Sequence, residues 1–535
     1  MPSLILYNGK IHTQDPSFRE VTAVAMRGNR ILAVGSDSEV RALAGRHTNR
    51  QIDLEGQRVL PGLSDSHFHY YDWALNRQHL DLASATSLTE LRTQVANLTS
   101  KISPGDWIIG QGWNETRWPV PNLITCADLD DLTPANPAIL WRSDMHLAVA
   151  NSYAMRAANI NAETEVPDQG VIDRDASGQP SGVLRELAIN LVREVIPPPT
   201  EDETVAAIRD GFTELHRLGL TGVHDFRIMG GADGPPAFRA YQRLQATGEL
   251  DLRMWMLLPG ERLNEAIEMG LRTGFGDDNL RVGHVKFFSD GGQGARTAWM
   301  LEPYEDNASF GMPLTPMDEI AEAIRRAHSA GLAVAIHAIG DRANQELVTV
   351  FDQVLRSKKS ATLRARHRIE HLQNIRPEDV LRLGRLGVVG SVQPTHVPDD
   401  FPMIDMSVGR RGQWSYPFRD LLTGGVTLAF GSDCPVADPN PLWGIHAAVT
   451  RQMRDGTPSG GWYPSQRLSV PEAVWGFTMG AALVCGREAE MGSITPGKLA
   501  DIVILDRDIF SIDPMEIAST QVLMTIFDGK VVYEG

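Results

Sequence analysis

The chain has 535 residues, of which 42% are hydrophobic and 22% are charged, a composition typical of globular proteins. This length exceeds the usual size of a single hydrophobic core, so we expect one large domain and a smaller one. The formal charge of −17, from 50 basic and 67 acidic residues, argues against a nucleic acid or an anionic membrane surface as partner.

Cysteine content and the start of the chain predict a cytoplasmic protein. The three cysteines cannot form a disulfide framework, and none belongs to a Cys-x-x-Cys pair, as expected in a reducing compartment. The first residues lack the basic start and the apolar core of a signal peptide. No apolar stretch approaches the roughly 20 residues of a membrane span.

Both ends of the chain read as short strands joined by tight turns. Asn8-Gly9 near the start and Asp528-Gly529 near the end are hairpin signals between apolar runs. We therefore expect one small β-sandwich, built from residues 1–58 and 486–535 together. Two unrelated hairpins are the alternative.

Between the two ends, apolar β-rich runs alternate with helical patterns, which predicts a parallel sheet. Eight such units are the number that closes a (β/α)8 barrel of the TIM type, here over residues 59–485. Too many residues for one loop separate the first run from the second, so an inserted α+β subdomain is expected at about 75–215. The eight predicted strands are Val59–His69, Leu220–Phe226, Leu252–Leu258, Arg281–Phe288, Leu332–Ala338, Arg368–His371, Val388–Val392 and Val426–Gly431.

Polar side chains occur where several of these strands end, which is the face of such a barrel that carries active sites. Two histidines separated by one residue end the first strand, and alternate strand residues point to the same side. Neutral imidazoles aimed at one point suit a zinc ion. Each residue alone has a plain structural explanation: a hydrogen-bonded core histidine, a lysine paired with a buried acid, an aspartate that caps a turn. Their joint arrangement favours one metal centre, and its candidate ligands are His67, His69, Lys286, His337, His371 and Asp433.

The order of these motifs resembles the amidohydrolase superfamily of metal-dependent hydrolases over nearly the whole chain. The resemblance includes the strand Pro61-Gly62-Leu63-x-Asp65-x-His67-x-His69 and the closing segment Gly492-Ser493-Ile494-x-Pro496-Gly497-Lys498. Three further blocks are similar to the amidohydrolase-3 branch, which includes N-substituted formamide deformylases. They are Lys286-Phe287-Phe288-Ser289-Asp290-Gly291, His337-Ala338-Ile339-Gly340-Asp341-Arg342 and Glu370-His371-Leu372-Gln373.

The resemblance implies a centre of one or two Zn²⁺ ions, with two favoured. His67, His69 and Asp433 would bind the more buried metal, and His337 and His371 the more exposed one. Lys286 would bridge them as a carbamate. An ammonium group has no acceptor and cannot bind a cation, whereas carboxylation makes it a bidentate anion. The reaction needs the neutral amine, which desolvation in an apolar strand favours.

The implied activity is hydrolysis of a C–N bond, in an amide or formamide of a small molecule, by metal-bound hydroxide. Asp433 would act as general base and then as general acid. Side chains that could contact the substrate are Trp113, Glu115, His146, Arg296 and His396. Three of these residues have alternative roles. Trp113 could be a buried anchor, Arg296 could brace the metal ligands, and His396 could be a structural histidine.

Other functions remain open on the same scaffold. A mononuclear deaminase of this superfamily has a glutamate three residues after the histidine of the fifth strand, whereas this chain has Gly340 there. Such a deaminase site also has no role for Lys286. A lactonase, esterase or phosphotriesterase would use the same centre. A binding protein without turnover is disfavoured, because every expected ligand is present. We also expect a homo-oligomer, a dimer.

Overall fold

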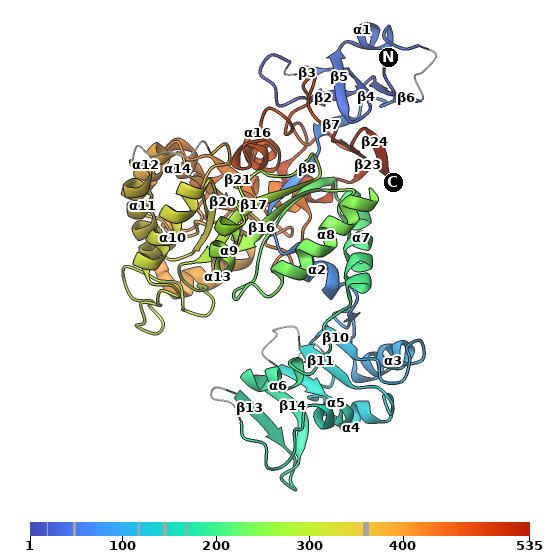
Figure 1. The fold of residues 1–535 in the computed structure, drawn as a ribbon, viewed down its shortest axis with the longest axis vertical. Coiled ribbons are helices and arrows are strands. Elements are labelled where there is room, and N and C mark those ends of the chain that lie inside the picture. The colour runs from blue at the N-terminus through green and yellow to red at the C-terminus, as the bar shows by residue number, and fades with distance from the viewer. Residues whose placement is uncertain (19, 46–49, 116–117, 143–146, 167–169, 357–362) are drawn as a thin grey trace. The chain divides into compact units, whose positions relative to one another are not determined.

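The computed structural model describes residues 1–535 except 19, 46–49, 116–117, 143–146, 167–169 and 357–362. The chain forms two compact units (Figure 1). One contains Met1–Trp73 and Ile208–Gly535, and the other contains Ala74–Ala207. Among the described residues, no helix combines the length and the hydrophobicity that a membrane span requires.

The larger unit is built around an eight-stranded parallel sheet. Its first and last strands also meet, because the Asp433 amide donates to the His67 carbonyl at 2.7 Å and Phe68 bridges to Cys434. The sheet is therefore a nearly closed barrel, which confirms the predicted fold class. Its strands are β8 (Leu63–Phe68), β15 (Leu220–Asp225), β16 (Arg253–Pro259), β17 (Leu280–Phe288), β18 (Val334–Ala338), β19 (Arg368–His371), β20 (Val389–Val392) and β21 (Leu428–Phe430).

Helices follow most of these strands and bury one apolar face each. In α10, Ile320, Ile324 and Ala327 are buried at a spacing of four and three residues, which places them on one side of the helix. The helix ends at Gly331, whose φ of 81° is the left-handed conformation that glycine adopts easily. The principal helices are α7 (Glu201–Arg217), α8 (Gly234–Thr247), α9 (Leu263–Glu268), α10 (Met317–Ala330), α11 (Asp341–Leu355), α12 (Pro377–Leu386), α13 (His396–Val408), α14 (Phe418–Thr423), α15 (Pro441–Thr450), α16 (Val470–Trp475) and α17 (Ala481–Val484).

The predicted first strand is two strands in the structure, and they belong to different sheets. β7 (Arg58–Pro61) pairs with strands of the terminal sandwich, whereas β8 starts at Leu63 in the barrel. Gly62 separates them, and a Cβ atom there would lie 2.3 Å from the Thr221 hydroxyl oxygen. The Pro-Gly turn thus passes the chain from sandwich to barrel through a space that only glycine fits.

Two sheets from both chain termini form the small sandwich. A shared apolar core fills the space between them, with Leu6 and Val24 from one sheet and Ile504 and Ile526 from the other. The first sheet contains β5 (Arg30–Gly35), β4 (Ala23–Arg27), β1 (Leu4–Tyr7) and β6 (Arg50–Asp53). The second contains β24 (Lys530–Glu534), β23 (Val522–Phe527), β22 (Ile502–Leu505), β7, β2 (Lys10–His12) and β3 (Glu20–Val21).

The smaller unit is an α+β layer with its own core. Its six-stranded sheet contains β13 (Gly170–Arg174), β14 (Pro180–Glu186), β12 (Leu147–Ala150), β11 (Ala138–Arg142), β10 (Ile108–Trp113) and β9 (Leu80–Asp81). Separate apolar clusters pack around Leu140 and around Ile139, neighbours whose side chains point to opposite faces of the sheet. Helices α3 (Leu88–Thr99), α4 (Ala127–Asp130), α5 (Ser152–Ala157) and α6 (Asn190–Arg193) accompany the sheet.

Candidate metal centre

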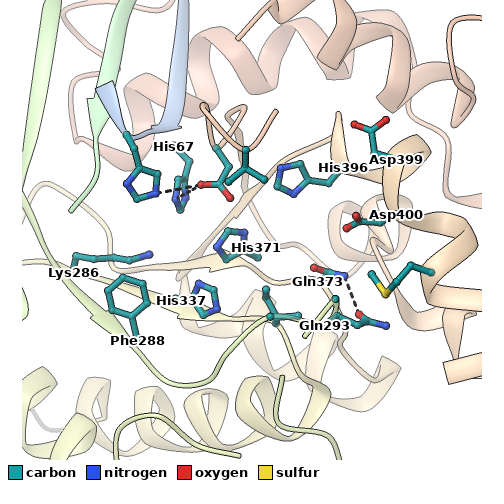
Figure 2. A pocket seen from close by; sticks show the side chains of 17 residues that line it. His67, Lys286, Phe288, Gln293, His337, His371, Gln373, His396, Asp399 and Asp400 are labelled. Carbon is teal, nitrogen blue, oxygen red and sulfur yellow. Dashed lines mark hydrogen bonds and ion pairs between the residues drawn. The ribbon is translucent and has the colours of Figure 1, made fainter. Parts of the chain in front are cut away.

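A cavity of about 390 Å³ opens where the barrel strands end (Figure 2). Five strands or the turns after them supply side chains to it, and α13 supplies its outer wall. The cavity combines a nitrogen-rich floor with acidic and apolar walls. The residues that line it are His67, His69, Lys286, Phe288, Gly292, Gln293, Gly294, His337, Ile339, His371, Gln373, His396, Asp399, Asp400, Met403, Asp433 and Val436.

His67, His69 and Asp433 meet at the floor of this cavity. Asp433 Oδ1 lies 3.2 Å from His67 Nε2 and 3.3 Å from His69 Nε2. The other ring nitrogen of His67, Nδ1, lies 2.7 Å from Glu370 Oε2. An ionised carboxylate only accepts, so Nδ1 carries the proton and Nε2 turns a lone pair toward Asp433. A lone pair and a carboxylate oxygen at this distance repel unless a proton or a metal cation lies between them, and the two imidazoles and the carboxylate fit a metal ion.

The charge of Asp433 is stabilised by its neighbours. Burial opposes ionisation, but His67 and His69 outweigh it and hold the pKa of Asp433 well below its usual range. The backbone of Asp433 has a φ of 61°, and that of His371 has a φ of 67°. Such left-handed conformations cost non-glycine residues about 1–3 kcal/mol each, and they are common at functional sites. The surrounding structure therefore holds both side chains in the cavity at a conformational cost.

His371 and His396 form a second group of possible ligands with Asp433. One ligand atom from each of the three lies within 4.8 Å of the others. His371 Nδ1 lies 2.9 Å from the amide oxygen of Gln393, which accepts its proton and leaves Nε2 free to bind a cation. His396 Nε2 is buried and has no hydrogen-bond partner among the described residues. A histidine of this group with an unsatisfied buried nitrogen also fits a metal, whereas the sequence predicts a substrate contact for His396.

Lys286 and His337 line the same cavity. Burial lowers the pKa of His337 to about 3, so its ring is neutral, and its Nε2 lies 3.4 Å from the Gly291 carbonyl. Burial also lowers the pKa of Lys286 to about 8, and its Nζ lies 4.6 Å from the centre of the Phe288 ring. In the described part of the chain, neither close group of possible histidine and carboxylate ligands contains His337.

The remaining predicted substrate residues have other contacts in the structure. Arg296 binds Asp306 at 2.5 Å. In the smaller unit, Trp113 is fully buried and its indole N–H donates to the Leu140 carbonyl, contacts typical of a core residue. Glu115 in the same unit forms an ion pair with Arg142 at 2.9 Å. His146 lies outside the described residues.

Several residues of the site were not found from the sequence. Glu370 and Gln393 accept hydrogen bonds from the candidate ligands His67 and His371, and the only sequence signal was a polar residue inside or just after a buried strand. Asp65 accepts from the backbone N–H groups of His67 at 3.0 Å and of Ser432 at 3.1 Å, and so connects β8 to the turn after β21. Asp65 belongs to the histidine motif, but no local pattern indicates its partner Ser432, 367 positions away.

Comparisons with known proteins identify the family of the chain. The model of the amidohydrolase family matches residues 50–533. The chain therefore belongs to the amidohydrolase family. It is a hydrolase that acts on carbon–nitrogen bonds, as the sequence predicts.

Individual relatives span the whole chain. The protein LONG AFTER FAR-RED 3 of Arabidopsis thaliana is 34% identical, over 99% of this chain and 91% of that protein. The N-substituted formamide deformylase of Arthrobacter pascens is 27% identical, over 100% and 99% respectively. An uncharacterised metal-dependent hydrolase from Pyrococcus furiosus superposes with a TM-score of 0.79 at 30% identity, over 95% of this chain and 100% of that one.

Proposed function

We propose that this amidohydrolase is a metal-dependent enzyme that cleaves the amide or formamide C–N bond of a small molecule. The observation that carries the proposal is the convergence of His67 Nε2 and His69 Nε2 on one Asp433 oxygen. The similarity to a formamide deformylase over the full chain supports the bond type. The cavity of about 390 Å³ suits a small molecule rather than a polymer.

Two sets of side chains would hold the metal. The inner set would contain His67, His69 and Asp433. The outer set would contain His371 together with His337 or His396. Imidazole and carboxylate ligands suit Zn²⁺, which we propose as the native ion. When bound, such an ion lowers the pKa of water and polarises a carbonyl oxygen.

Lys286 would complete the centre as a carbamate between the two sets. It is 2% exposed on β17, and its Nζ points into the cavity that the histidines line (Figure 2). Addition of carbon dioxide to the neutral amine, with release of one proton, would give a carbamate anion with two oxygens, a ligand type that suits a position between two metal sites.

Asp433 would move the proton during hydrolysis. Its neighbours keep it ionised, so it can accept a proton from the attacking water at the floor of the cavity. The protonated Asp433 carboxyl would then donate that proton to the leaving nitrogen, which must be protonated before it departs as an amine. Phe288, Met403 and Val436 provide an apolar wall for the rest of the substrate.

A panel of N-formyl amines, N-acyl amines, lactones and aminated heterocycles tests the reaction class. We expect turnover of the amides with Asp433 intact, and a loss of about 10²–10⁴-fold in kcat for Asp433→Asn. Asp405→Asn, at an exposed position of α13 that does not line the cavity, is the matched control and should keep full activity. Unchanged amide hydrolysis by Asp433→Asn would overturn the proton-transfer role. Turnover of lactones or heterocyclic amines alone would overturn the bond type.

A further inference from the structure

We infer that Arg368, which does not line the active-site cavity, positions the metal ligand His67 through Glu370 and thereby sets the affinity of the centre for its metal. This inference rests on the proposed function, because it assumes that His67 binds a metal. It assigns a task to a buried charged network that the hydrolytic step itself does not use.

Arg368 is completely buried in the barrel and contacts four different strands. Its Nε donates to Glu370 Oε1 at 2.5 Å, and its Nη2 donates to Glu370 Oε2 at 2.9 Å. Nη2 also donates to the Ser66 carbonyl at 2.5 Å and to the Ser391 hydroxyl. Nη1 lies 2.9 Å from His224 Nδ1. These contacts use the fixed planar fork of a guanidinium, which a lysine ammonium cannot reproduce.

The direction of every hydrogen bond in this network is determined. A guanidinium has no acceptor, so His224 Nδ1 must accept from Arg368 and His224 carries its proton on Nε2. That Nε2 lies 3.2 Å from the Cys485 sulfur, which accepts it. At the other end, Glu370 can only accept, so the His67 Nδ1 proton points to it at 2.7 Å. The network therefore fixes the His67 tautomer that leaves Nε2 free for a metal.

Phe226 fixes the plane of the same imidazole. Its ring stacks on His67 with centroids 3.7 Å apart and an interplanar angle of 7°. The Arg368 guanidinium carbon lies 5.0 Å from the centre of that phenyl ring. Both partners are fully buried, so neither can move aside into solvent. His67 is thus held in one tautomer and one orientation before any metal binds.

A purely structural role is a weaker explanation of this network. The interior of such barrels is ordinarily filled by branched apolar side chains. A buried ion pair is usually no more stable than well-packed apolar residues of similar size. Removal of the partner of a metal-binding histidine, in contrast, typically weakens metal affinity 10–100-fold. Arg368 and Glu370 therefore fit a positioning role better than a packing role.

Zinc affinity of the full-length chain tests the inference. Metal-stripped wild type, Glu370→Gln and Arg368→Lys are each titrated with Zn²⁺ against a competing chelator, and the absorption spectrum of the Co²⁺-loaded proteins reports the ligand geometry. Asp501→Asn is the matched control, because Asp501 is 7% exposed and pairs with the buried Arg253 at 2.9 Å, outside the cavity.

We expect Glu370→Gln to weaken zinc affinity 10–100-fold and to alter the Co²⁺ spectrum, with Arg368→Lys intermediate because it keeps the charge but loses the fork. Asp501→Asn should lower the melting temperature and leave zinc affinity within twofold. The inference is overturned if folded Glu370→Gln binds zinc as tightly as wild type, if Asp501→Asn loses as much affinity, or if both network variants fail to fold even with zinc. A wild-type chain that binds no zinc overturns the proposed metal centre as well.

Discussion

Replacement of Lys286 by methionine should stabilise the metal-free protein at neutral pH, although it removes a proposed metal ligand. The Lys286 ammonium is 2% exposed, and burial lowers its pKa from 10.5 to about 8. This difference corresponds to roughly 3 kcal/mol of destabilisation at pH 7, because each factor of ten in acidity is worth about 1.4 kcal/mol. Methionine has a similar length and carries no charge, so it should recover most of that energy.

The effect has a definite pH dependence. The folded chain holds the Lys286 proton less tightly than the unfolded chain, so the cost is constant below about pH 8. Between pH 8 and 10.5 the folded protein has lost the proton and the unfolded chain still binds it, so wild-type stability rises. The advantage of Lys286→Met should therefore fall from about 3 kcal/mol at pH 7 to below about 1 kcal/mol at pH 10.

Thermal unfolding after chelator treatment measures this advantage. For a unit of roughly 400 residues, 3 kcal/mol corresponds to a rise of about 4 °C in Tm at pH 7. Lys530→Met, at an exposed position of β24, is the control and should leave Tm unchanged at both pH values. A Lys286→Met variant no more stable than wild type at pH 7, or a gain that persists at pH 10, would refute the reasoning.

Three further substitutions test other parts of the structure. Gln393→Leu removes the acceptor of His371 Nδ1 and should weaken zinc affinity about 10-fold in a chelator competition; an unchanged Kd contradicts its role. Asp399→Asn at the cavity wall should raise KM 2- to 5-fold for an ammonium-bearing amide, by about 0.5–1 kcal/mol, and leave KM for a neutral amide unchanged. Gly340→Ala would place a Cβ atom 2.0 Å from the Trp299 carbonyl and should cost about 1–3 kcal/mol in thermal unfolding. Gly294→Ala, with open space around its Cα, should leave Tm unchanged, and equal effects of the two would contradict the packing argument.

The barrel was predictable because its strands are nearly continuous apolar runs between helical patterns. The strand Arg368–His371 has the same bounds in prediction and structure. The observed β20 and β21 differ from their predicted ranges only by one or two residues at the ends. The break at Gly62 was harder to place, because a Pro-Gly turn does not say that the strands on its two sides join different sheets. Which sheet each strand joins is decided by hydrogen bonding to strands far away in the sequence.

The candidate ligands were predictable from strand ends, but their supports were not. Glu370 lies 303 positions from His67, and no local pattern connects the two. The one local signal was the alternation Arg368-Ile369-Glu370 in a buried strand, where two charges point to the barrel interior. His396 begins a helix rather than ending a strand, and the sequence predicts a substrate contact for it; in the structure it also belongs to a group of possible ligands with His371 and Asp433.

The central claim is that His67, His69 and Asp433 hold a metal on which C–N hydrolysis depends. Metal analysis of the purified chain, combined with amide hydrolysis before and after chelation, tests it most directly. We predict at least one bound divalent ion per chain, loss of activity on chelation, recovery with added Zn²⁺, and no recovery in a His67→Ala, His69→Ala double variant. Amide hydrolysis that survives chelation, or that the double variant retains, would contradict the claim.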